Sequence, residues 1–156
     1  MGKPNYWLMK SEPDAYSIDD LKRNGSVPWT GVRNYEARNF MRDEMKNGDK
    51  ALFYHSNVNP PVIAGVMEIC SDPYADHTQF DPESKYFDPK SSESEPRWHL
   101  IDVKFIKKFE SSVTRNELKE IPELKEMMLF KRNRLSITKV REHEFQKILK
   151  MADNSI

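Results

Sequence analysis

Short apolar runs with strand character recur along this chain, and helical segments separate them in no regular order. The strand candidates are residues 6–9, 50–55, 62–69 and 98–109, with a short extended piece at 135–137. The first, Tyr6-Trp7-Leu8-Met9, lies between Pro4 and Pro13 and predicts a buried strand. Because regular βαβ alternation is missing, we expect an α+β fold with a curved sheet or partial barrel.

Capping signals mark the predicted helices. Ser17 is a good N-cap for a helix that ends at Asn24-Gly25. Apolar residues recur on one face from about Asn34 to Met45, which predicts a second helix. Thr114-Arg115-Asn116-Glu117 is a capping box that opens a third, and we expect the last helix to begin at Thr138.

The 156 residues suit one domain, spanning 1–156, with a core large enough to fold alone. No apolar run approaches the ~20 residues needed to cross a bilayer. Cys70 is the only cysteine, so the fold needs no disulfide or oxidising compartment. We therefore expect a monomer in the cytoplasm, or in the nucleus if the cell is eukaryotic.

The chain has 25 basic and 25 acidic residues, but they are unevenly spread. Residues 71–96 hold seven acidic and two basic side chains, whereas residues 97–156 hold fourteen basic and nine acidic ones. A net charge of zero argues against long non-specific binding to a nucleic-acid backbone, although a basic patch beside a pocket is compatible with it. The 71–96 segment, rich in Asp, Ser and Pro, predicts a long surface loop.

Signals of catalysis are weak. The sequence has no Gly-rich phosphate loop, no G-x-S-x-G elbow and no H-E-x-x-H motif. His55 and Ser56 are neighbours on a predicted strand and point to opposite faces, so they make a poor pair of base and nucleophile. Cys70 is predicted to be an inert core residue. A metal site drawn from Asp72, Asp76, His77 and Asp81 is less favoured than four solvated side chains. We expect no enzyme, cofactor or metal.

Signals of binding are stronger. Trp29 lies in a connection between Pro28 and Gly31, where it can stack on a ligand or plug the barrel end. Polar side chains follow two strands, namely Lys10, Ser11 and Glu12 after the first, and His55 and Ser56 on a later one. Arg33 and Asn34 precede a helix, where Asn34 is an N-cap or the free amides meet an anion. Lys131, Arg132 and Arg134 are a basic cluster, either solvated or in contact with phosphate.

Several long motifs, in matching order from Tyr6 to Met151, resemble the EVE-domain family. They are Tyr6-Trp7-Leu8-Met9-Lys10-Ser11-Glu12-Pro13, Trp29-x-Gly31-Val32-Arg33-Asn34-Tyr35-x-Ala37-Arg38-Asn39-Phe40-Met41-Arg42, Phe53-Tyr54-His55-Ser56-Asn57, Thr78-Gln79-Phe80-Asp81, Trp98-x-x-x-Asp102-Val103-x-Phe105 and Arg134-Leu135-Ser136-Ile137. Residues 70–76 differ from the sequence that is usual for the family in this segment.

The resemblance implies a PUA-like small mixed β-barrel with flanking helices, related to YTH and ASCH domains. It also implies binding of DNA or RNA that carries a modified base, held by stacking and by hydrogen bonds to its edge. By the same resemblance Lys10, Ser11 and Glu12 line one side of the pocket, Trp29 stacks on the base, Asn34 and Tyr35 form the floor, and His55 and Ser56 lie on the facing strand. We predict that contacts to the nucleic-acid backbone come from Arg33, Arg38, Lys131, Arg132 and Arg134.

Three functions stay open from the sequence. The leading hypothesis is a non-catalytic reader of a modified base. The second is a protein-interaction module that uses the acidic loop 71–96, and the third is an enzyme acting on a nucleotide or RNA base through His55.

Overall fold

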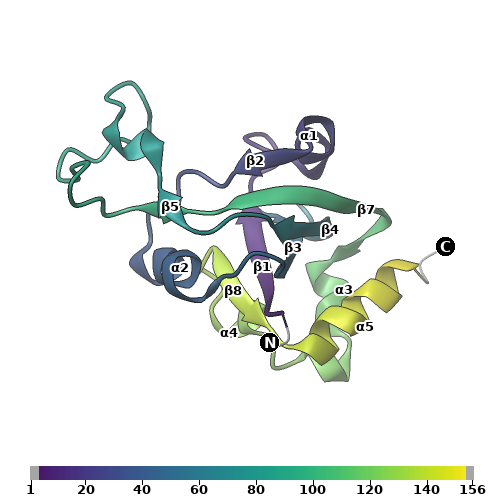
Figure 1. Cartoon of the computed structure of the whole chain (residues 1–156). Coiled ribbons are helices and arrows are strands. Elements are labelled where there is room, and N and C mark those ends of the chain that lie inside the picture. The colour runs from purple at the N-terminus through teal and green to yellow at the C-terminus, as the bar shows by residue number, and fades with distance from the viewer. Residues whose placement is uncertain (1–3, 154–156) are drawn as a thin grey trace.

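A six-stranded sheet organises the computed structural model, which describes residues 4–153 (Figure 1). Its strand order is β2-β7-β4-β3-β1-β8, with β1 and β3 parallel and every other neighbouring pair antiparallel. The strands are β1 (Tyr6–Ser11), β2 (Ser26–Pro28), β3 (Lys50–His55), β4 (Val62–Ile69), β7 (Asp102–Thr114) and β8 (Ile137–Val140). The sheet curls into a half-barrel, which confirms the α+β prediction.

Helices flank the curled sheet, and a small second sheet stands apart from it. The second sheet pairs β5 (Tyr74–Ala75) with β6 (His99–Leu100), and the residues between them form a lobe at the left of Figure 1. The α-helices are α1 (Ile18–Asn24), α2 (Tyr35–Asn39), α3 (Arg115–Lys119), α4 (Met128–Lys131) and α5 (Glu142–Asp153). Short helices of other types are η1 (Phe40–Glu44, π), η2 (His77–Phe80, 3₁₀) and η3 (Pro122–Leu124, 3₁₀).

Two apolar cores lie on the two faces of the sheet, because successive strand residues point to opposite sides. Trp7, Met9 and Phe53 face the core that α1, α2 and η1 cover. Leu8 and Leu52, their neighbours in the chain, face the core that α3, α4 and α5 cover. The alternation along β1 and β3 therefore sorts the helices into two layers around the half-barrel.

Local signals placed many element boundaries correctly. Strands 50–55 and 62–69 are found where they were predicted, and β1 runs on to Ser11. Ser17 caps α1 through a capping box with Asp20, and Thr114 does the same for α3 with Glu117. The strand predicted over 98–109 is split into β6 and a longer β7.

Three predictions of secondary structure need correction. The helix predicted from Asn34 to Met45 is α-helical only to Asn39 and then widens into η1. The last helix begins at Glu142 rather than Thr138, because Thr138 pairs with Leu8 in strand β8. The segment 71–96 is more than a surface loop, since it contains β5, η2 and the buried side chains of Asp76 and Gln79.

Within residues 4–153, no helix is long and apolar enough to span a membrane. The same part of the chain contains no group of three or more His, Cys, Asp or Glu side chains placed to hold a metal ion.

Candidate functional site

A cleft of about 1190 Å³ opens where several strands of the half-barrel end. Strand β1 ends with Lys10 and Ser11, which lie beside Tyr54 and His55 of the parallel strand β3. Between these strand ends and the β2–α2 connection, the lining residues are Lys10, Ser11, Glu12, Ala15, Tyr16, Val27, Pro28, Trp29, Thr30, Gly31, Val32, Arg33, Tyr54, Ser56, Asn57, Pro61, Lys85, Tyr86, Arg115, Asn133, Arg134 and Ser136.

Trp29 is one aromatic wall of this cleft and is also part of the core. Only 8% of its surface is exposed, and its ring meets Phe53 edge to face with centroids 5.6 Å apart. The Trp29 amide donates a hydrogen bond to Ile101 O at 3.0 Å, which holds the connection against β7. Trp29 is thus mainly a core residue, the plug considered from the sequence, and it also borders the cleft, while stacking on a ligand stays a prediction.

The three polar residues predicted at the end of the first strand, Lys10, Ser11 and Glu12, line the cleft together with Ser56. Lys10 Nζ donates to Asn133 O at 2.9 Å, and Ser11 Oγ donates to Tyr16 O at 2.6 Å. Glu12 Oε1 accepts from Asn57 Nδ2 at 3.3 Å. Each side chain is thus oriented by another segment of the chain.

His55 does not line the cleft. Its Nε2 accepts a hydrogen bond from the Ile18 amide at 3.1 Å, and its ring packs edge-on against Phe53. Burial lowers the pKa of His55, and Lys108 lowers it further, while Asp19 acts in the opposite direction. The neutral ring, which keeps Nε2 free to accept, anchors the start of α1.

Asn34 and Tyr35 do not form the floor of the cleft as predicted. Asn34 Oδ1 accepts from Ala37 N at 3.0 Å, so this residue caps α2 and borders a second, smaller cavity. Tyr35 is 51% exposed and stacks on Trp98 with centroids 4.7 Å apart. The guanidinium of Arg38 lies over the Tyr35 ring, also at 4.7 Å. The first turn of α2 points these side chains away from the cleft.

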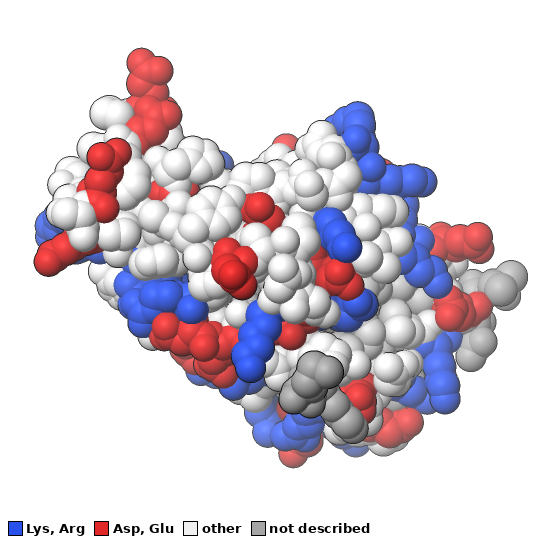
Figure 2. Space-filling model, in the orientation of Figure 1, with Lys and Arg blue, Asp and Glu red and all other residues white. Residues whose placement is uncertain are grey.

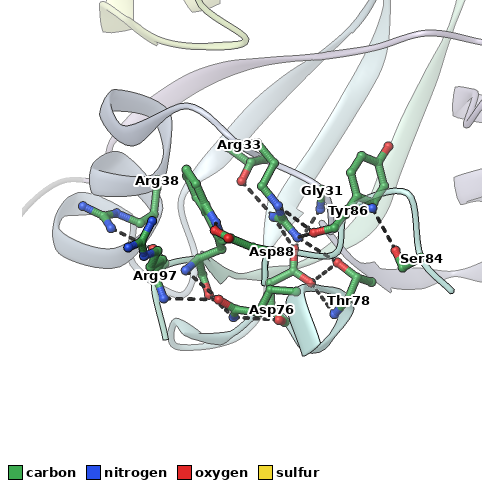
Figure 3. Close-up of polar contacts among 12 residues, drawn as sticks. Gly31, Arg33, Arg38, Asp76, Thr78, Ser84, Tyr86, Asp88 and Arg97 are labelled. Atoms are coloured by element: carbon green, nitrogen blue, oxygen red, sulfur yellow. Dashed lines mark hydrogen bonds and ion pairs between the residues drawn. The ribbon is translucent and has the colours of Figure 1, made fainter. Parts of the chain in front are cut away.

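Arg33 reaches into the lobe instead of presenting a free cation to a nucleic-acid backbone (Figure 3). Its guanidinium pairs with Asp76 Oδ2 at 3.1 Å and donates to Tyr86 O at 2.7 Å and to Thr78 Oγ1 at 3.1 Å. These partners occupy the donors that a phosphate would need.

Asp76 is the buried acceptor at the centre of this network. Burial alone would raise its pKa, but hydrogen bonds from Thr78, Gly31 N and Arg33 outweigh that effect and lower the pKa. Gln79, also buried, donates to Asp76 O and Trp98 O, both at 2.7 Å. The lobe is therefore ordered around internal polar groups, and its acidic outer side chains are visible at the upper left of Figure 2.

Tyr86 brings a second aromatic wall from the lobe to the cleft. Its ring rests on Gly31, where an added Cβ would come within 2.5 Å of it, and Gly31 has φ +85°. Arg33 and Lys85 lie 5.5 and 5.1 Å from the ring centroid. Sequence patterns did not identify Tyr86, Lys85 or Arg115 as site residues, because no local motif links them to Trp29, whereas Tyr54 belongs to the motif 53–57.

Positive charge dominates the cleft. Its charged lining consists of five cations and one carboxylate, which are Lys10, Arg33, Lys85, Arg115, Arg134 and Glu12. Because Arg33 is paired with Asp76, which lies outside the lining, the uncompensated balance is 4 − 1 = +3 in a chain whose net charge is zero. Of the predicted backbone contacts, Arg33 and Arg134 line the cleft, but Arg33 is paired with Asp76, and Arg38 lies outside the cleft over the Tyr35 ring. Lys131 and Arg132 border the smaller cavity and pair with Glu126 and Glu36.

Comparison with known proteins gives consistent matches over nearly the whole chain. The EVE domain family matches residues 5–151. The chain is 42% identical to Thymocyte nuclear protein 1 of Mus musculus, over 96% of this chain and 74% of that one, and 44% identical to the Danio rerio protein, over 96% and 73%.

Solved structures agree with the sequence matches. A human THYN1 protein in complex with DNA containing 5-methylcytosine is 40% identical, with a TM-score of 0.91 and coverage of 97% of this chain and 99% of that one. A hypothetical protein from Leishmania major is 46% identical, with a TM-score of 0.94 and coverage of 97% and 96%. An ASCH protein from Zymomonas mobilis, 10% identical with a TM-score of 0.54, shares the fold.

Proposed function

The chain belongs to the EVE domain family, and from this premise we propose that it is a non-catalytic reader of a modified base in a nucleic acid. The observation that carries the proposal is the cleft itself, which combines two aromatic walls, Trp29 and Tyr86, with an uncompensated charge of +3. A base that leaves its stack needs an aromatic face and polar partners for its edge, and the attached phosphates need cations.

Four of the five predicted ligand residues that line the cleft, together with Tyr86, hold the base in this proposal. Trp29 and Tyr86 are the stacking surfaces. Ser11, Glu12 and Ser56 are the polar groups that read the base edge, because hydroxyl and carboxylate oxygens accept from an exocyclic amine and a hydroxyl also donates.

DNA that contains 5-methylcytosine is the first ligand to test, because the human relative was solved with such DNA. A methyl group at C5 adds apolar surface to the base, and the aromatic walls offer apolar surface to bury it. The name of the vertebrate relatives supports a nuclear location if this chain comes from a eukaryote.

Two side chains suited to catalysis are engaged elsewhere, which supports binding without turnover. The acceptor nitrogen of His55 is occupied by the Ile18 amide. Burial and the neighbouring Asp102 raise the pKa of the Cys70 thiol, so the thiolate needed for nucleophilic attack is disfavoured.

Fluorescence anisotropy with labelled oligonucleotides tests the proposal. The set comprises plain DNA and RNA and versions with 5-methylcytosine, 5-hydroxymethylcytosine and N6-methyladenine. We expect a preference for one modified base that Trp29→Leu abolishes, since leucine keeps an apolar side chain in the core but is smaller and removes the stacking face. Tyr35→Phe is the control, because Tyr35 is an aromatic residue outside the cleft.

A Trp29→Leu protein that is folded by circular dichroism and binds unchanged would overturn the proposal. Flat titrations for every oligonucleotide at low salt would do the same, and they would favour the interaction module built on residues 71–96.

A further inference from the structure

Four neighbouring strands meet at one edge of the half-barrel and bring two cations, Lys10 and Arg115, to it. Lys10 of β1 is the register partner of Tyr54 in β3. Tyr54 pairs with Ile63 of β4, and the adjacent Val62 pairs with Thr114, the last residue of β7. Arg115 follows at once, with its amide bonded to Pro61 O at 2.9 Å.

The other side of β1 adds a third cation to this edge. The Lys10 amide donates to Ser136 O at 2.9 Å, and Lys10 Nζ donates to Asn133 O at 2.9 Å. Arg134 lies between these two anchoring residues and lines the same cleft. We call these three residues, Lys10, Arg115 and Arg134, the cation triad.

The cation triad is electrostatically uncompensated. No carboxylate of the described chain, residues 4–153, forms an ion pair with any of its three members. The one carboxylate in the cleft, Glu12, is held by Asn57 Nδ2. Arg115 packs over the Phe130 ring at 5.1 Å, and Lys10 Nζ lies 5.8 Å from the Tyr54 ring centroid.

Two consequences of this packing favour an anion. Burial lowers the pKa of Lys10, and the nearby Arg115 lowers it further, so the two like charges work against each other in the unliganded protein. A bound anion would relieve that repulsion. An arginine provides paired N–H donors for phosphate oxygens, and a lysine provides a point charge.

We propose that Lys10, Arg115 and Arg134 form a phosphate subsite, which binds a backbone phosphate next to the base held in the cleft. This inference rests on the proposed function and specifies its ligand as a nucleotide within a strand rather than a free base or nucleoside. Arg33, whose donors are used by the lobe, is not part of the subsite.

Charge-neutralising substitutions with a matched control test the subsite. Arg115→Gln and Arg134→Gln each remove one member, while Arg132→Gln removes the same charge two residues from Arg134 at a side chain paired with Glu36. We expect each member variant to weaken oligonucleotide binding about ten-fold and to reduce the slope of log K against log[salt] by about 0.7 to 1. Arg132→Gln should change binding less than about two-fold.

Two further readouts separate phosphate binding from a loss of structure. Arg115→Lys should restore most of the affinity lost in Arg115→Gln, because it keeps the charge. The preference for a modified over a plain oligonucleotide should survive in Arg134→Gln, since a phosphate contact carries no base information. Titrations with the modified nucleoside, its 5′-monophosphate and a trinucleotide then distinguish a free nucleotide from a strand. A monophosphate that binds as tightly as the trinucleotide would show that the subsite serves a free nucleotide and overturn the strand assignment.

The outcomes distinguish the subsite from the proposed function. If the wild-type protein selects a modified oligonucleotide but Arg115→Gln and Arg134→Gln behave like Arg132→Gln, the subsite is wrong and the reader stands. If the wild-type protein binds neither oligonucleotide nor monophosphate, both proposals fall.

Discussion

The carboxylate of Asp76 accepts a hydrogen bond from the backbone amide of Gly31 at 2.8 Å, although 45 residues separate them. The same oxygen pairs with Arg33. This contact ties the lobe to the connection that carries Trp29, and it holds the Tyr86 ring against Gly31. The shape of the cleft therefore depends on a buried polar network outside it.

Asp76→Asn should destabilise the fold by about 2 kcal/mol, because the amide leaves the charge of the half-buried Arg33 without its partner. Chemical denaturation measures the change in the free energy of unfolding. Asp72→Asn, an exposed residue on the same segment, should stay within about 0.5 kcal/mol of the wild type. Equal stability of the two variants would mean that the network does not support the lobe.

Gly31→Ala should destabilise the protein more than Gly25→Ala. Both glycines have a positive φ, +85° and +84°, so alanine is strained at each position. An added Cβ at Gly31 also meets the Tyr86 ring at 2.5 Å, whereas nothing lies within 4 Å at Gly25. Overpacking should add about 1 kcal/mol or more. Thermal and chemical unfolding of both variants measures the difference, and equal losses would contradict the close packing of Tyr86.

His55 should make stability depend on pH. Its pKa is lower in the folded protein than the usual 6.5, so the unfolded chain binds the proton more readily. Neutral His55 stabilises the folded protein fully at pH values above the pKa of the unfolded chain. This contribution to the free energy of unfolding is lost progressively as the pH falls from that pKa to the lower pKa of the folded protein. Urea denaturation between pH 8 and pH 5 measures it.

His55→Gln, which keeps an acceptor for the Ile18 amide without titrating, is the comparison for this pH dependence. The variant should lose less stability than the wild type over the same range. The pKa of His99 is also lowered, by burial first, and its contribution should persist in both proteins. An identical pH dependence of the two proteins would exclude His55 as its source.

Asn34→Ala should lower stability by about 1 kcal/mol through the lost N-cap of α2. It should leave oligonucleotide affinity unchanged, because Asn34 lies outside the cleft. Asn34→Asp keeps a capping oxygen and should restore the stability. Anisotropy and denaturation measured on the same samples separate the two effects, and a loss of affinity without a loss of stability would return Asn34 to the binding site.

Short-range patterns in the sequence determined much of the architecture. The apolar runs at 50–55 and 62–69, the N-caps Ser17 and Asn34 and the capping box at Thr114 act over a few residues, so a single sequence displays them directly. Of the polar side chains predicted at strand ends, Lys10, Ser11, Glu12 and Ser56 line the cleft, whereas His55 turns to the Ile18 amide instead.

Tertiary structure alone decided which residues meet at the cleft. Arg115 reaches the edge beside Lys10 only because the strand order places β7, β4, β3 and β1 side by side. Tyr86 reaches Gly31 because hydrogen bonds to Asp76 and from Arg33 tie the lobe to the connection before α2. Pairing with β1 made Thr138 a strand residue, and the packing of the lobe against the connection before α2 brought Arg33 to Asp76. Contacts between residues 43 or more positions apart depend on how the sheet closes, and local propensity carries no information about that closure.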